Sequence, residues 1–164
     1  MRDKVIAALR RDGRAPLTAL ARLLKRDVDD IHRIIKEEEG TTITKFTSLL
    51  NYELLGYPTH VVMVLAVSSK ERAAFTSFLN KSQHLNGLFS INNGYDFLLD
   101  LIFKDMRQVH SFVEQLESKF TIYERKEYYI LATFAEQRFM ANPDLLPQES
   151  RARDFHRVPQ QPLP

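Results

Sequence analysis

The chain has 164 residues, of which 44% are hydrophobic and 27% charged, as in an ordinary globular protein of one mid-sized domain or two small ones. It has no cysteine, which excludes a disulfide framework, a thiolate metal site and a cysteine nucleophile, and which agrees with a cytoplasmic location. No signal-peptide core is visible at the N-terminus, and the longest apolar run, residues 61–67, is too short to cross a bilayer.

Positive charge is concentrated at the N-terminal end. Residues 1–36 contain ten Lys and Arg against five Asp and Glu, whereas residues 61–137 contain eight against nine. A basic N-terminal module on a nearly neutral body favours binding to nucleic acid. The charge alone fits a solvated basic helix face equally well.

Three short helices are predicted in the first forty residues. Residues 3–12 carry apolar side chains at helical spacing and are followed by Gly13, which ends the helix. Residues 17–24 have a wide apolar face, and Asp27 is the expected N-cap of a third helix over residues 28–38. This order, with a brief turn before the third helix, is typical of a helix-turn-helix.

The third helix would then be the recognition helix, which enters the major groove of DNA. Lys and Arg neutralise phosphates, and Arg can pair with guanine, so removal of Arg33 and Lys36 is expected to weaken duplex binding. A small helical dimerisation or capping unit is the alternative. The candidate DNA contacts are Lys25, Arg26, His32, Arg33, Lys36 and Lys45.

From residue 60 onward, a strand-helix-strand pattern occurs twice. This βαββαβ order predicts a ferredoxin-like sandwich, in which two helices cover one face of a four-stranded antiparallel sheet. Several strands are apolar on both sides, so we expect the open face to pack on a second copy of the chain. The predicted elements are strand 60–67, a helix capped by Ser68 or Ser69 that runs to about residue 81, strand 88–91, strand 95–104, helix 106–120 and strand 122–134.

A hairpin turn is predicted at Asn92-Asn93-Gly94, because an Asn-Gly pair readily supplies the positive φ angles of a two-residue turn. With the helix-turn-helix and the βαββαβ order, this turn makes residues 1–136 resemble the Lrp/AsnC family of transcriptional regulators, also called feast/famine regulatory proteins. The residues that carry the resemblance are Asp12-Gly13-Arg14, Leu20-Ala21, Ile31-His32-Arg33, Leu54-Leu55-Gly56 and Asn93-Gly94-Tyr95-Asp96.

The resemblance implies an α+β fold. An N-terminal three-helix (winged) helix-turn-helix is joined by a strand linker to the ferredoxin-like βαββαβ sandwich. The division it implies is a DNA-binding domain at 1–44, a linker strand at 45–59, a dimerisation and effector-binding domain at 60–137 and a flexible tail at 138–164.

The family resemblance also implies a function. Such regulators bind double-stranded DNA, form homodimers through the C-terminal sheets and often assemble into tetramers or octamers, and many bind an amino acid between dimers. In the effector pocket, backbone N–H groups at the turn would hold a carboxylate and Asp96 an ammonium. Alternatively, Asn-Gly is only a hairpin turn and Asp96 caps it. No cofactor or metal is expected. By position, the pocket would be lined by Asn92, Asn93, Gly94, Tyr95 and Asp96.

The sequence departs from the family pattern in three places. Leu24-Lys25-Arg26 lacks the usual glycine of the turn, and the recognition helix begins with Asp27, Asp29 and Asp30 in place of small polar residues. Both departures argue against DNA affinity. A threonine common in the last strand is replaced within Arg125-Lys126-Glu127, which argues against amino-acid binding.

Two alternative functions on this scaffold are open. One is an effector-sensing or interaction protein on the same scaffold that has lost DNA binding. The other is an enzyme similar to the siroheme decarboxylases, which use histidines around a tetrapyrrole. The histidines form no close pair and no ligand motif, so no enzymatic activity is expected. They are His32, His60, His84, His110 and His156.

Overall fold

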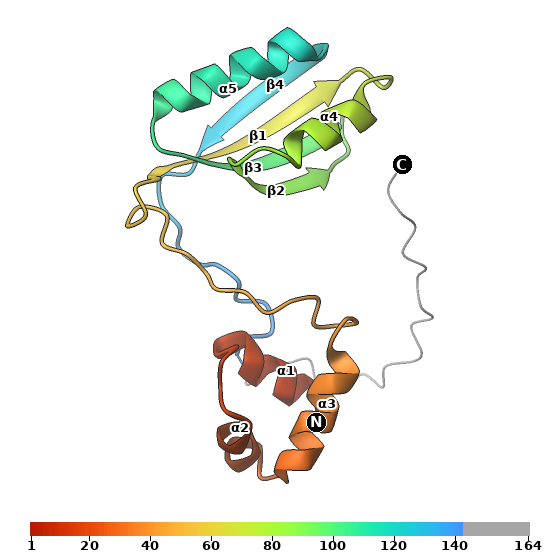
Figure 1. The fold of residues 1–164 in the computed structure, drawn as a ribbon, viewed down its shortest axis with the longest axis vertical. Helices are drawn as coiled ribbons and strands as arrows, with labels where there is room; N and C mark the ends of the chain where they lie inside the picture. Colours follow the sequence, from red (N-terminus) through yellow and green to blue (C-terminus); the bar gives the residue numbers. More distant parts are fainter. Residues whose placement is uncertain (143–164) are drawn as a thin grey trace. The chain divides into compact units, whose positions relative to one another are not determined.

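The structure is a computed structural model that describes residues 1–142. It divides into two compact units, one made of residues 1–49 together with the segment that begins at Phe134, the other of residues 50–133. The first unit contains α1 (Arg2–Arg11), α2 (Leu17–Leu24) and α3 (Val28–Glu38) (Figure 1). The three predicted helices are confirmed to within one residue at each end.

A small apolar core holds these helices together, because each helix turns one apolar stripe inward. At the turn between α2 and α3, the Arg26 backbone N–H donates to the Ala21 carbonyl at 2.9 Å, and Lys25 adopts a left-handed conformation with φ 53°. Such a backbone costs a non-glycine residue roughly 1–2 kcal/mol. The buried residues of this core are Val5, Ala8, Leu20, Ala21, Ile31 and Ile35.

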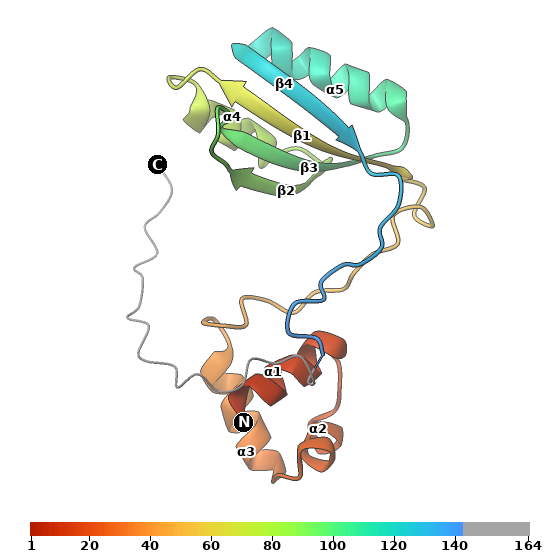
Figure 2. The ribbon, with the colours of Figure 1, turned by 180° about the vertical axis from the view of Figure 1, so that it is seen from behind.

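The second unit is a four-stranded antiparallel sheet in the order β2-β3-β1-β4. Helices α4 and α5 lie over one face (Figure 1), and the opposite face carries no described helix of this unit (Figure 2). The predicted ferredoxin-like sandwich is therefore confirmed. Its elements are β1 (Thr59–Val67), α4 (Arg72–Leu79), β2 (Leu85–Ser90), β3 (Phe97–Phe103), α5 (Met106–Lys119) and β4 (Ile122–Tyr129).

The alternation of buried and half-buried side chains along the central strands β1 and β3 sets the register of the sheet. Val61 pairs with Leu101 and Met63 with Leu99, and all four side chains are buried beneath the helices. Val62 and the other intervening residues of β1 point to the open face, where they are only half-buried. A shift of one residue would exchange the two faces, so burial fixes the pairing.

Two features of the linker and the wing differ from the prediction. Residues 45–58 contain no strand, so the linker is not a strand. Before β1, the described β pairing is limited to one isolated bridge between Glu39 and Ile43, so the helix-turn-helix has no wing built of strands. Among the described residues, this segment has no neighbouring strand with which to pair.

Strand and helix ends in the second unit also differ. Strand β4 ends at Tyr129 and not at residue 134, because its partner strand β1 begins only at Thr59. Helix α4 begins at Arg72, with Glu71 and not Ser68 or Ser69 as its N-cap, because the Glu71 N–H first closes a turn on the Ser68 carbonyl at 2.9 Å.

The segment after β4 returns to the helical unit. The Arg10 side chain donates to the Phe139 carbonyl at 3.1 Å and to the Gln137 carbonyl at 2.8 Å. Residues 134–142 thus belong with the helices, whereas the sequence assigned 134–137 to the sheet domain and 138 onward to the tail. The rest of the predicted tail, residues 143–164, lies outside the described residues.

Candidate nucleic-acid interface

The outer face of α3 carries the side chains predicted to contact DNA. Ile31 and Ile35 are buried against the other helices, which leaves His32, Arg33 and Lys36 exposed on the opposite side. Of the other candidates, Lys25 and Arg26 are exposed at the turn before α3, and Lys45 is exposed beyond its C-terminal end. The α2–α3 turn and α3 therefore bring five of the six candidates onto one continuous stretch of the helix-turn-helix.

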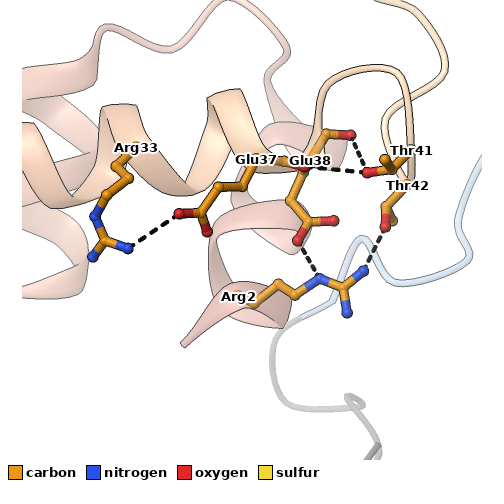
Figure 3. Close-up of polar contacts among 6 residues, drawn as sticks. All are labelled: Arg2, Arg33, Glu37, Glu38, Thr41 and Thr42. Carbon is orange, nitrogen blue, oxygen red and sulfur yellow. Dashed lines mark hydrogen bonds and ion pairs between the residues drawn. The ribbon is translucent and has the colours of Figure 1, made fainter. Parts of the chain in front are cut away.

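Both cations of α3 have acidic partners on the same helix or at its end. Arg33 contacts the Asp30 carboxylate at 3.1 Å and the Glu37 carboxylate at 3.2 Å, the latter drawn in Figure 3. The hydrogen bond to Asp30, followed by that to Glu37, raises the pKa of Arg33. Lys36 contacts Glu39 at 2.8 Å. The positive charge of α3 is thus neutralised within the helix-turn-helix.

An ion pair that the sequence did not reveal joins α1 to the end of α3. The Glu38 carboxylate is largely buried, with the residue 9% exposed, and accepts from the Arg2 guanidinium, which also donates to Thr42 (Figure 3). Burial opposes ionisation of Glu38, but hydrogen bonds from Thr42 and Arg2 and the charge of Arg2 outweigh it and hold its pKa below the usual value. This contact fixes the C-terminal end of α3 against α1.

The turn predicted to bind an effector has the expected backbone. Asn93 has φ 65° and Gly94 has φ 88°, and both are exposed together with Asn92. The closing hydrogen bond runs from the Ile91 N–H to the Asp96 carbonyl at 3.0 Å, so the loop is longer than the predicted two-residue turn. β3 begins only at Phe97, after Asp96 has donated its own N–H to strand β1.

Asp96 is bound within the chain. Its N–H donates to the Leu65 carbonyl at 2.8 Å, and its carboxylate accepts from the Val67 N–H at 2.8 Å and pairs with Arg72 at 2.5 Å. Its side chain is 19% exposed. The carboxylate expected to meet an ammonium ligand therefore already has a cation and a backbone donor.

Tyr95 is also engaged. Its hydroxyl bonds to the Glu124 carboxylate, and Lys126 lies over its ring with Nζ 5.1 Å from the centroid. The hydrogen bond from Tyr95 lowers the pKa of Glu124. The interaction of Lys126 with Tyr95 raises the pKa of Lys126. Lys126 lies in the Arg125-Lys126-Glu127 segment of β4, so this segment is structurally coupled to the turn.

The open face of the sheet is apolar near its centre and polar at one end. Val64 pairs with Leu98 there, and both are half-buried in the single chain, while Phe89 on the neighbouring strand is 55% exposed. At the polar end, Asp100 accepts from both His60 and Asn86. The carboxylate that the sequence places in mid-strand is thus satisfied inside the chain.

The histidines are not brought together. His60 bonds to Asp100 on the open face, whereas His84 stacks on Phe103 beneath the helices, with ring centroids 4.5 Å apart. His32 and His110 are exposed, and His156 lies outside the described residues. Among residues 1–142, no group of three or more His, Cys, Asp or Glu side chains could hold a metal ion. In the same range, no helix has the length and apolarity that a membrane crossing needs.

Comparison with known proteins gives a consistent picture, although no family model matches the sequence. The HTH-type transcriptional regulator FL11 of Pyrococcus abyssi is 28% identical over 116 residues, which cover 70% of this chain and 77% of that protein. An uncharacterized HTH-type transcriptional regulator of Pyrococcus horikoshii is 23% identical over 141 residues, which cover 85% of this chain and 95% of that protein.

Solved structures agree in fold. LrpC of B. subtilis has a TM-score of 0.75 at 17% identity over 82% of this chain and 96% of its own. AsnC of E. coli has a TM-score of 0.72 at 14% identity over 82% and 93%. The chain has the fold of the Lrp/AsnC regulators. A third Lrp/AsnC-like structure, a Neisseria meningitidis transcriptional regulator in complex with L-Met, has a TM-score of 0.76 at 17% identity over 82% and 90%.

Proposed function

We propose that this chain is a DNA-binding transcriptional regulator of the Lrp/AsnC type that works in the cytoplasm. The observation that carries the proposal is the helix-turn-helix itself, with the exposed outer face of α3 and the cations of the preceding turn. The curated relatives, which are HTH-type transcriptional regulators, support the same function.

Dimerisation through the open face of the sheet is the second part of the proposal. An exposed apolar sheet face is unfavourable in water, and packing on a second copy would bury Val64, Leu98 and Phe89 at once. A twofold-symmetric dimer would also present two recognition helices to two half-sites of an operator. Assembly of such dimers into tetramers or octamers is compatible with this arrangement.

The test is a titration of fluorescent duplex DNA, taken from upstream of the protein's own gene, with purified protein at several salt concentrations. For a DNA-binding regulator, the logarithm of the binding constant falls linearly with the logarithm of the salt concentration, because phosphate contacts release counterions. Absence of binding at 50 mM salt, with the protein still dimeric by light scattering, would refute the DNA-binding part alone.

A response to an amino acid or a related small molecule is the third part. The exposed turn at Asn92, Asn93 and Gly94 offers backbone N–H groups to a carboxylate, and a regulator of the same fold has been solved with L-Met. Arg72 occupies the carboxylate of Asp96, so an ammonium must compete with a guanidinium. A thermal-shift screen with the L-amino acids tests this, and a rise in Tm that the Gly94→Ala variant loses would support it.

An interaction protein that has lost DNA binding is the second candidate. The ion pairs of Arg33 and Lys36 favour it, since they leave α3 without free positive charge. This candidate predicts an intact oligomer without a salt-sensitive interaction with duplex DNA, so the same titration separates the two functions.

A further inference from the structure

Three cations in the last turn of α2 and in the turn that follows it differ from those of α3, because they have no partners within residues 1–142. Arg22, Lys25 and Arg26, here called the turn cluster, are exposed, and within residues 1–142 their side chains make no hydrogen bond, ion pair or ring contact. They line a hollow of about 400 Å³ together with Ala21, Asp27 and Asp30. Two carboxylates therefore share the hollow with three positive charges.

The cations of α3 offer much less net positive charge to an incoming phosphate. Arg33 lies between Asp30 and Glu37, so this group of three carries a net negative charge, and Lys36 is balanced by Glu39. Exposed ion pairs are weak and can open. Their carboxylates nevertheless stay on the helix and would repel any phosphate that approached the freed cation.

The conformation of Lys25 is a second, independent observation. Its left-handed backbone, with φ 53° and ψ 53°, closes α2 through the Lys25 N–H, which is directed at the carbonyls of Ala21 and Arg22. This role needs only a backbone N–H, and glycine would fill it without strain. The described contacts of the turn therefore do not need the Lys25 side chain. That side chain nevertheless places an ammonium beside the hollow.

We infer that the turn cluster, and not Arg33 or Lys36, holds the phosphates when DNA is bound. The inference rests on the proposed DNA-binding function and assigns the phosphate contacts within it. The hollow is open to solvent and lies directly before the N-terminal end of α3, so a backbone phosphate held there would position the start of α3. Arg33 and Lys36 would then stiffen α3 through their ion pairs.

The experiment compares two variants that each lose two positive charges. One carries Lys25→Gly and Arg26→Gln, and the matched control carries Arg33→Gln and Lys36→Gln. Binding to the same upstream duplex is measured between 50 and 300 mM salt. Each lost phosphate contact lowers the salt slope by about 0.9 and weakens binding roughly eightfold at 0.1 M salt. For each bound helix-turn-helix, the turn variant is expected to lose about 60-fold in affinity and the control less than about threefold, and the two subunits of a dimer multiply these factors.

Unfolding cannot mimic this result, because Lys25→Gly relieves backbone strain and is expected to raise Tm while it weakens DNA binding. A merely structural role of Lys25 would move both quantities in the same direction. A second turn variant, Arg22→Gln with Arg26→Gln, leaves the Lys25 backbone untouched and is expected to show the same loss.

The outcomes are distinct. Equal losses in the turn variant and the control, or a larger loss in the control, overturn the inference and leave the regulator function standing. Absence of duplex binding by the unmodified protein at 50 mM salt overturns both. A large loss in the two turn variants with a folded, dimeric protein supports the assignment.

Discussion

Replacement of Asp96 by asparagine is expected to destabilise the sheet unit even without a ligand. The carboxylate accepts the Val67 N–H at 2.8 Å and pairs with Arg72, and its side chain is 19% exposed. Hydrogen bonds to a charged group contribute about 1.5–3 kcal/mol, and an ion pair to a half-exposed arginine adds at most about 1 kcal/mol. The Asp96→Asn side chain would keep the shape but lose the charge, so we expect a loss of about 2 kcal/mol.

Arg72→Gln is the matched control. It removes the ion pair but leaves the hydrogen bond between the Val67 N–H and the carboxylate, so it is expected to cost less than about 1 kcal/mol. Urea unfolding followed by circular dichroism, at one fixed protein concentration because of the proposed dimer, measures both free energies of unfolding.

The comparison separates two roles of Asp96. A residue kept for an absent ligand commonly costs stability, so its replacement leaves the free protein unchanged or more stable. If Asp96→Asn unfolds at the same urea concentration as the unmodified protein, or costs no more free energy of unfolding than Arg72→Gln, then stabilisation of the fold is refuted as the main role of the Asp96 carboxylate.

Three further variants test other parts of the structure. Glu38→Gln is expected to cost about 1.5–3 kcal/mol in urea unfolding at pH 7. Hydrogen bonds from Thr42 and Arg2 and the charge of Arg2 hold the folded-state pKa of Glu38 below its usual value of 4.5. This stabilisation is therefore present above pH 4.5 and is lost as the pH falls through the lower folded-state pKa, and a variant that is as sensitive to acid as the unmodified protein would contradict this. Leu98→Glu places a charge at the centre of the open face and is expected to give a folded monomer by light scattering, whereas a persistent dimer would place the interface elsewhere. Gly94→Ala, at φ 88°, is expected to lower the free energy of unfolding by about 1–2 kcal/mol, and an unchanged value would show that the loop relaxes.

Local patterns in the sequence predicted the parts of the fold that depend on local physics. The helical spacing of Ile31 and Ile35 places α3 correctly, because the period of buried residues reflects which face meets the core. The positive φ angles follow from the residue types, because Gly94 has no Cβ and the short polar side chain of Asn93 tolerates the left-handed region. Strand ends were less accurate, since the end of β4 depends on where β1, a strand much earlier in the chain, begins.

The candidate site was predicted less well, for two reasons. Asp96 and Val67 are 29 residues apart, and His60 and Asp100 are 40 apart, so no local pattern connects them. The ion pairs of Arg33, in contrast, join residues three and four apart on one helix, and this spacing is visible in the sequence. The prediction from the sequence treats Asp30 as repelling phosphates but does not pair Asp30 and Glu37 with Arg33, so it overstates the charge that Arg33 can offer to DNA.

Two departures from the family pattern have a common explanation in this structure. Acidic residues in the first turn of α3 stabilise the helix through its dipole, and Asp30 also forms an ion pair with Arg33. Lys25, where the family pattern has a glycine, places a cation without a partner among residues 1–142 in the turn before α3, beside Arg26. The positive charge of the helix-turn-helix is therefore displaced from the recognition helix to the turn before it. On this view, the aspartates and Lys25 do not argue against DNA binding; they change which residues hold the phosphates.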